Sequence, residues 1–187
     1  MEHASTQTPT RVVLCLPVEH GPNGTQVLLG LKQCGFGAGR VVAPGGKIEP
    51  GESPEAAAVR ELVEETSLVA DIASLLPAAR VYFRFPANPA ADMDCTIYLT
   101  SAFTGMARPS AELAPEWHPV ENLPLERMWD DSALWLGRIL SGERFDALVR
   151  LAADNESVDG FSTFNWPGHG IPAADATEAD YPDITQA

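Results

Sequence analysis

The chain has 187 residues, 45% of them hydrophobic, which is enough for one globular domain with a core and extra terminal segments. Its formal net charge of −14 at pH 7 argues against nucleic-acid polymers and membrane surfaces as partners, because both require clustered lysine and arginine. A small anionic substrate is compatible with this charge if metal ions neutralise an acidic site locally.

The compartment is predicted from signals that the sequence lacks. No apolar run reaches membrane-spanning length, and the first ten residues lack the basic and then apolar pattern of a signal peptide. Cys15, Cys34 and Cys95 are odd in number and lack metal-ligand spacing. We therefore expect a cytosolic protein whose thiols are reduced and buried or partly buried.

The domain is predicted to begin with a β-hairpin. Residues 11–18 (RVVLCLPV) and 26–32 (QVLLGLK) are rich in leucine and β-branched residues, and Asn23-Gly24 marks the turn between them. Residues 33–40 (QCGFGAGR) carry three glycines, which either bring the backbone close to a ligand or form a flexible connection.

The clearest helix signal covers residues 54–66. Ser53 suits the N-cap, and Pro54 suits the first helical position because its missing N–H would have no intrahelical partner. An alanine-rich run then favours helix. Thr66 and Ser67 weaken this propensity, so the helix is predicted to end there.

The rest of the domain is predicted to contain three strands, a helix and a second hairpin. The expected ranges are 80–85, 95–103 and 116–120 for the strands, 131–140 for the helix, and 144–152 with 157–164 for the hairpin. Asp131 or Ser132 is the expected N-cap of this helix. The predicted fold class is α/β, a sandwich with a mixed β-sheet between helices. The domain would span 11–164, between a loose segment 1–10 and an acidic, proline- and alanine-rich tail 165–187.

The helix at 54–66 places Glu61, Glu64 and Glu65 at i, i+3 and i+4, so their carboxylates share one face. These like charges repel one another, and Arg60 is the sole cation between residues 56 and 68. Clustered carboxylates become favourable when a hard divalent cation binds among them, and Mg²⁺ takes oxygen ligands. A solvated acidic face is the alternative, but the preceding glycine turn and Glu52 favour a metal site.

This stretch resembles the Nudix box of hydrolases that act on nucleoside diphosphate-linked substrates. The matching positions are Gly46, Glu52, Arg60-Glu61-Leu62, Glu64-Glu65 and Leu68. Even six of these positions, each matched by chance about one time in ten, give roughly 10⁻⁶ per starting point, so coincidence is not a serious alternative. Ser67 departs from the pattern, because the family usually has glycine there and serine is less favourable in a left-handed conformation.

The resemblance extends over roughly residues 11–163, towards MutT-type enzymes that hydrolyse oxidised purine nucleoside triphosphates. The segments LGLKQCGFGAGR and MWDDSALW carry it, and Lys32, Phe36 and Glu112 match positions of that branch. The resemblance implies a mixed sheet between helices and cleavage to a nucleoside monophosphate and pyrophosphate. It also implies a Mg²⁺ cofactor, which Mn²⁺ can replace, and a loop glutamate, here Glu112, that reaches the metals.

Residue chemistry and the resemblance together suggest roles. The expected metal ligands are oxygen donors: the Gly45 carbonyl, Glu52, Glu61, Glu64 and Glu65. One glutamate must orient or deprotonate the attacking water, and Glu61 and Glu112 both remain candidates. Arg60 is expected to hold a box glutamate in a bidentate pair within the catalytic set. Lys32 either meets a phosphate or is an ordinary lysine at a strand end.

Base recognition is where the sequence departs from the oxidised-purine branch. That branch has tryptophan and asparagine after GAGR, whereas this chain has Val41 and Val42, so an amide that bonds the base is missing. Without a gap, Asp131 matches the first of two base-reading aspartates and Ser132 stands in place of the second. Substrate identity therefore does not transfer directly, since one buried polar contact can decide specificity.

Aromatic side chains are expected to form the walls of the base pocket by stacking. Phe36 in the glycine-rich segment and Trp129 beside Asp131 are the preferred candidates. Phe83, Phe85 and Trp117 are alternatives that more commonly belong to a core.

Other functions remain open at this point. A nucleotide sugar or dinucleotide as substrate would suit the less polar pocket that Val41 and Val42 create. A nucleotide sensor of the same fold would not need the intact glutamate set, because it activates no water. An isomerase of isoprenoid diphosphates would need a cysteine near the metals, and neither Cys34 nor Cys95 has a matching context. The oligomeric state, monomer or homodimer, is not predicted.

Overall fold

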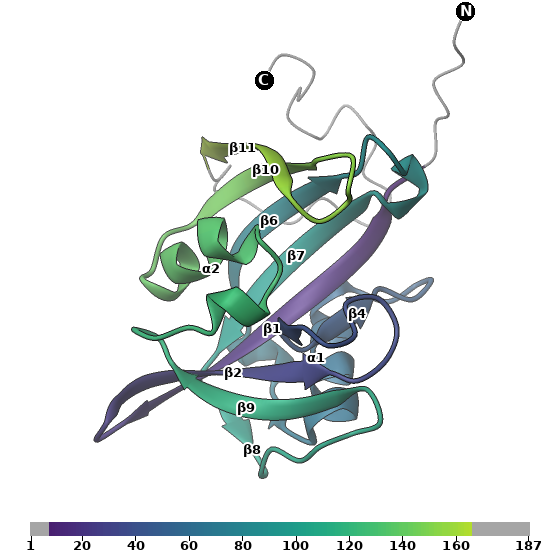
Figure 1. Cartoon of the computed structure of the whole chain (residues 1–187). Coiled ribbons are helices and arrows are strands. Elements are labelled where there is room, and N and C mark those ends of the chain that lie inside the picture. The colour runs from purple at the N-terminus through teal and green to yellow at the C-terminus, as the bar shows by residue number, and fades with distance from the viewer. Residues whose placement is uncertain (1–7, 166–187) are drawn as a thin grey trace, which may run out of the picture.

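The computed structural model of the chain describes residues 8–165. Within that range the chain forms two α-helices, three 3-10 helices and eleven strands (Figure 1). The strands are β1 Thr10–Gly21, β2 Gly24–Lys32, β3 Val41–Val42, β4 Gly45–Lys47, β5 Val69–Ala70, β6 Leu76–Arg84, β7 Met93–Thr100, β8 Phe103–Thr104, β9 Leu113–Pro119, β10 Phe145–Leu151 and β11 Val158–Asn165. The helices are α1 Pro54–Thr66 and α2 Ser132–Leu140, with 3-10 turns at η1 Ile72–Ser74, η2 Pro89–Ala91 and η3 Leu125–Arg127.

Nine of these strands form one mixed sheet. Its order is β11-β10-β6-β7-β1-β2-β3, while β4 pairs with β1 and β9 pairs with β2. The pairs β1–β7 and β6–β10 are parallel, and the other pairs of this sheet are antiparallel. The short strands β5 and β8 pair separately.

Each face of the sheet is covered by one helix, and the strands alternate between two hydrophobic clusters. In β1, Val13 and Cys15 pack with α1, whereas Leu16 packs in the cluster that contains α2. Side chains of a strand alternate between the two faces, so one strand can serve both clusters. The α/β class, with a mixed sheet between helices, is therefore confirmed (Figure 1).

The predicted elements are largely present, with differences where short-range signals are weak. The first hairpin and the hairpin around Asp154-Asn155 form as expected. The expected strand 95–103 is interrupted, so that β7 ends at Thr100 and β8 starts at Phe103. The glycine pair that was expected only as a turn forms β4, because Gly45 pairs with Leu14 of β1.

The chemical state of the cysteines is as expected, but their burial is not. All three thiols are free, and Cys15 and Cys95 are buried, whereas Cys34 is exposed. Cys34 lies in the glycine-rich segment outside the sheet, so no hydrophobic layer covers it.

Among the described residues, no helix is long and apolar enough to cross a membrane. The predicted C-terminal tail lies outside the described residues, except for Asn165.

Helix α1 begins and ends as the sequence predicts. The Ser53 hydroxyl accepts a hydrogen bond from the Ala56 N–H at 3.1 Å, and Pro54 occupies the first turn. At the other end Ser67 takes φ 64° and ψ 8°, and its N–H donates to the Val63 carbonyl. This is the left-handed C-cap that glycine adopts most easily, so serine is strained here.

We expect Ser67→Gly to raise the free energy of unfolding by about 0.5–1 kcal/mol, because relief of the left-handed strain outweighs the added freedom of the unfolded chain. Urea unfolding of both proteins would measure the change. Ser141 is a matched control, because it caps α2 at φ −80°, where glycine brings no relief. Ser141→Gly should lower stability. A lower stability for Ser67→Gly as well would contradict the assignment of strain.

Candidate active site

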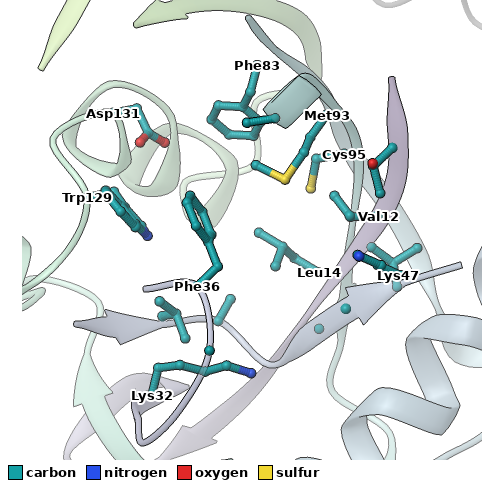
Figure 2. A pocket seen from close by; sticks show the side chains of 18 of the residues that line it. Val12, Leu14, Lys32, Phe36, Lys47, Phe83, Met93, Cys95, Trp129 and Asp131 are labelled. Atoms are coloured by element: carbon teal, nitrogen blue, oxygen red, sulfur yellow. The ribbon is translucent and has the colours of Figure 1, made fainter. Parts of the chain in front are cut away.

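A pocket of about 850 Å³ opens on the face of the sheet that carries α2. Figure 2 shows Val12 and Leu14 of β1 on its floor, with Phe36 and Trp129 on one side and Lys32 near one end. Charged groups line one part of the pocket, and aromatic and aliphatic side chains line the other. The charged part includes Lys32, Lys47, Glu61, Glu64 and Glu112. We call these two parts the carboxylate end and the aromatic end.

The carboxylate end depends on the glycine pair of β4. A side chain at Gly45 would collide with the backbone of β1, so the close pairing of these strands requires glycine. A side chain at Gly46 would collide with the carboxylate of Glu61. Helix α1 packs against the other face of the sheet, and the missing side chain at Gly46 lets Glu61 reach the pocket. Both glycines, Gly45 and Gly46, are therefore required for steric reasons.

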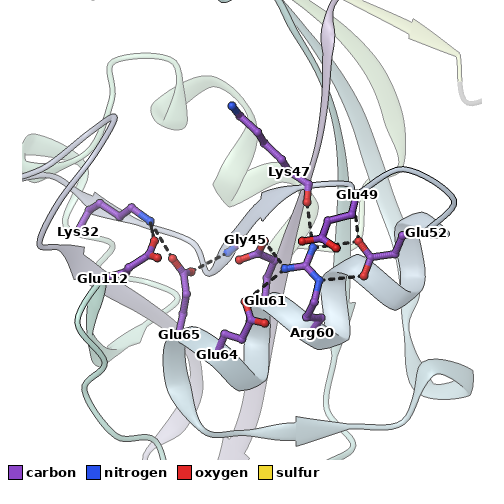
Figure 3. A network of polar contacts seen from close by, with 10 residues as sticks. All are labelled: Lys32, Gly45, Lys47, Glu49, Glu52, Arg60, Glu61, Glu64, Glu65 and Glu112. Atoms are coloured by element: carbon purple, nitrogen blue, oxygen red, sulfur yellow. Dashed lines mark hydrogen bonds and ion pairs between the residues drawn. The ribbon is translucent and has the colours of Figure 1, made fainter.

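Arg60 holds the carboxylates of the motif together (Figure 3). Its Nε and Nη2 donate to the two oxygens of Glu52, both at 2.9 Å, which is the bidentate pair that the sequence predicted. Its Nη1 donates to Glu61 at 2.7 Å and to Glu64 at 3.3 Å. Nη2 also donates to the Lys47 carbonyl at 3.0 Å, which ties α1 to β4.

These contacts shift the pKa values of the groups involved. The hydrogen bonds from Arg60 lower the pKa of Glu52. For Glu61, burial raises the pKa, and the charges of Glu65 and Glu64 act in the same direction, although Arg60 partly opposes them. Burial therefore disfavours the negative charge of Glu61 even though Arg60 is paired with it.

Lys32 forms a second bridge at this end. Its Nζ donates to Glu65 at 2.8 Å and to Glu112 at 3.2 Å (Figure 3). The other oxygen of Glu65 accepts the Gly45 N–H at 2.9 Å. Burial alone would lower the pKa of Lys32, but the bonds and charges of Glu65 and Glu112 raise it. Lys32 thus brings together one glutamate of α1 and one from the loop before β9.

The predicted metal ligands lie close together but do not form a closed cage. Among residues 8–165, no three His, Cys, Asp or Glu side chains converge as such a cage would require. Glu52 and Glu61 are paired with Arg60, and Glu65 with Lys32 and the Gly45 N–H. The donors still fit Mg²⁺, which takes oxygen ligands and is commonly held by one or two carboxylates, substrate phosphates and water.

The stacked rings of the aromatic end come from the loop between β2 and β3 and from the segment before α2. The rings of Phe36 and Trp129 are stacked, with centroids 5.1 Å apart and planes inclined by 18°. The guanidinium of Arg40 lies over the Trp129 ring at 4.1 Å, a cation–π contact. Phe36 is 64% exposed, so its other surface is available for a ligand.

Asp131 lies on the wall of the aromatic end, and its predicted place as the N-cap residue of α2 is confirmed, although its side chain makes no capping hydrogen bond. It occupies the cap position of α2, but its carboxylate accepts the Trp135 indole N–H at 2.7 Å. Burial raises the pKa of Asp131, and this N–H only partly offsets the effect. The side chain turns inwards because the indole N–H provides a partner within the same helix. Ser132, the other expected cap, is the first helical residue and also lines the pocket.

The structure places most of the predicted substrate residues in the pocket. Val41, Val42, Phe83 and Phe85 line it, together with Phe36, Trp129 and Asp131. Trp117 does not, because it stacks on Phe103 beside the cluster that contains α1. The pocket is also lined by residues that the sequence did not predict there, namely Lys47, Met93, Cys95 and Asn155. Arg40 is likewise an unpredicted partner of Trp129. A glycine-rich signal next to Arg40 was available, but nothing local indicated the others.

Comparison with known proteins shows what the chain is similar to. A family model described as "NUDIX domain" matches residues 8–150. The oxidized purine nucleoside triphosphate hydrolase of Danio rerio is 36% identical over 138 residues, which cover 74% of this chain and 84% of that protein. The Mus musculus protein of the same name is 36% identical over 120 residues, which cover 64% of this chain and 75% of that protein.

Solved structures agree on the fold. A mutator MutT protein from Bacillus halodurans superimposes with a TM-score of 0.68 at 24% identity. The superposition covers 84% of this chain and 99% of that chain. The mixed sheet and its two helices are therefore the arrangement of MutT structures.

We expect Asp131→Asn to gain stability relative to the wild type as the pH rises. The pKa of Asp131 is raised in the folded state, so the folded protein binds more protons than the unfolded chain above about pH 4, the ordinary value of aspartate. The wild type therefore loses stability as the pH rises through the folded pKa, and asparagine does not.

Urea unfolding at several values between about pH 4 and pH 7 would measure this difference. Asp130→Asn is the matched control, because it removes the same formal charge from an exposed neighbour. The same pH dependence in both variants would show that burial of Asp131 is not the cause.

Proposed function

The chain belongs to the NUDIX family, and we propose that it hydrolyses oxidised or otherwise modified purine nucleoside triphosphates to a nucleoside monophosphate and pyrophosphate. The observation that carries this proposal is that one continuous pocket joins the carboxylate end to the aromatic end. A purine has a flat apolar surface, and a phosphate chain requires cations and ordered water. The names of the two relatives, oxidized purine nucleoside triphosphate hydrolase, support hydrolysis and the same substrate class.

NUDIX hydrolases generally need a divalent metal ion, and we propose Mg²⁺, which Mn²⁺ can replace. The Gly45 carbonyl, Glu61, Glu64 and Glu65 would hold it, with Glu52 supporting them through Arg60. When bound, the cation would neutralise phosphate oxygens and activate water for attack on phosphorus. Glutamates outnumber the cations Lys32, Lys47 and Arg60 in the network of Figure 3, so this end retains negative charge for the metal.

The side chains of the chain itself would position the reactants. Arg60 fixes Glu61 beside Gly46, so the carboxylate loses little freedom when substrate binds. Glu61 or Glu112 would accept the proton of the attacking water. Glu61 is held by Arg60 and largely buried, whereas the side chain of Glu112 is 61% exposed and paired with Lys32. Lys32 would exchange a carboxylate partner for a phosphate oxygen when the chain of phosphates enters.

At the aromatic end, Phe36 and Trp129 would stack on the base, and Asp131 would hydrogen-bond its edge. Asp131 is suited to this because it lines the pocket and only one of its carboxyl oxygens is engaged by the Trp135 indole, which leaves the other oxygen for the base. Val41 and Val42 add an apolar wall to the pocket. This wall supports one alternative, a diphosphate-linked substrate such as a nucleotide sugar or dinucleotide.

The domain limits 11–164 and the cytosolic location stay predictions.

The test is Mg²⁺-dependent release of pyrophosphate or phosphate from a panel of substrates. The panel should contain normal, oxidised and methylated purine triphosphates, nucleotide sugars and dinucleotides. Preference for a modified purine triphosphate with release of pyrophosphate would support the proposal. Activity only on diphosphate-linked substrates would support the alternative. Nucleotide binding without turnover would indicate a sensor.

We expect Glu64→Gln to lower turnover by about two orders of magnitude or more, because it removes a charged oxygen donor from the metal site. The side chain of Glu64 is 60% exposed, so the fold should persist with an unchanged unfolding midpoint. Glu126→Gln, at an exposed position away from the pocket, is the control and should keep full activity. Wild-type activity of Glu64→Gln under Mg²⁺ would refute the metal-site assignment.

Val42→Asn should raise the preference for oxidised guanine nucleotides, because it introduces an amide into the pocket wall. The measurement is kcat/KM for an oxidised guanine triphosphate relative to its normal counterpart. Val42→Leu is a suitable control, since it changes size without adding a hydrogen-bonding group. An unchanged ratio in Val42→Asn would show that this position does not face the base.

A further inference from the structure

The turn between β10 and β11 places Asn155 on the wall of the pocket. Asn155 has a φ of 58°, a left-handed conformation that asparagine adopts more readily than most residues. Its backbone N–H donates to the Ala152 carbonyl at 3.0 Å. The backbone of Asn155 therefore helps to close the turn without the help of its side chain.

Asp154, not Asn155, supplies the side chain that orders this turn. Its carboxylate accepts hydrogen bonds from the N–H groups of Glu156 and Ser157, both at 2.9 Å. The other carboxylate oxygen accepts the Ser157 hydroxyl at 2.5 Å. The turn is thus stabilised without the amide of Asn155.

The amide of Asn155 is incompletely satisfied. Within residues 8–165 its Oδ1 is buried and has no hydrogen-bond partner. A buried polar atom without a partner is destabilising, and native proteins retain few of them. Because Asn155 lines the pocket, a group that enters the pocket can supply the missing donor, directly or after a rotation of the amide.

Arg40 places this turn at the aromatic end. Its Nη2 lies 3.3 Å from Glu156, the residue after Asn155. Its Nη1 donates to the Met128 carbonyl at 3.2 Å, and the same guanidinium lies over Trp129. Asn155 is therefore near the ring that would stack on a base, and Asp131 lines the same end (Figure 2).

We propose that Asn155 reads the hydrogen-bonding edge of the purine base, an inference that rests on the proposed function. An amide carries an acceptor oxygen and a donor nitrogen side by side. It can therefore pair with a base edge that presents a donor next to an acceptor, such as the amino group and N7 of adenine. The apolar walls strengthen this selection, because a base that leaves the amide unpaired bears the cost of its desolvation. Asn155 thus supplies an amide to an end where Val41 and Val42 supply none.

Two variants test this role without disturbing the turn. Asn155→Gly keeps the left-handed conformation and removes the amide, and Asn155→Asp keeps the side-chain shape and replaces the donors by an acceptor. For each protein we would measure kcat/KM for purine and pyrimidine triphosphates, the Kd for the purine monophosphate by calorimetry, and the unfolding midpoint.

The expected result is a fall of about tenfold or more in the ratio of purine to pyrimidine kcat/KM for Asn155→Gly, with a matching weaker Kd. Asn155→Asp should change the order of kcat/KM among purine triphosphates, since the side chain can no longer donate a hydrogen bond.

An unchanged ratio of purine to pyrimidine kcat/KM in Asn155→Gly, or an equal loss for all substrates, would overturn the role of Asn155. The proposed function would still hold in that case if the wild type turns over the triphosphate. If the wild type hydrolyses no triphosphate, the proposed function fails. Asn155 is then judged by Kd alone, and an equal Kd in Asn155→Gly overturns its role.

Discussion

The site depends on one guanidinium placed among carboxylates. Arg60 pairs with Glu52, Glu61 and Glu64 and also donates to the carbonyl of Lys47, so it links the box helix to β4. Without it, like charges on one face of α1 would repel one another, and Glu61 would be partly buried without a counter-charge. The planar fork of arginine makes these contacts simultaneously, which the single ammonium group of lysine does not.

Much of the fold follows from local signals in the sequence. Ser53 and Pro54 define the start of α1, Asn23-Gly24 defines the first hairpin, and alternating apolar residues define the long strands. Short elements could not be predicted in this way. Gly45 belongs to a strand only because β1 lies beside it, and a glycine pair has no intrinsic preference for a strand.

The site was predictable where its residues share one helix and unpredictable where they meet across the fold. Glu61, Glu64 and Glu65 follow from helical periodicity alone. The bridge from Lys32 to Glu65 and Glu112 joins residues that lie 33 and 80 positions apart, so no local pattern reveals it. Asp131 was expected to cap α2, but the indole of Trp135 competes successfully for its carboxylate. Tertiary partners decided these side-chain positions.

The excess of glutamate over lysine and arginine at the carboxylate end also affects how a substrate arrives. A triphosphate without bound cations meets repulsion from this end and from a protein of net charge −14. Added salt at roughly 0.1 M screens that repulsion at separations beyond about 10 Å, so moderate ionic strength speeds the encounter of such an anion. This dependence is opposite in sign to that of basic proteins that bind polyanions. A nucleotide that arrives already paired with its divalent cation avoids most of the barrier, which favours the cation–nucleotide complex as the species captured from solution.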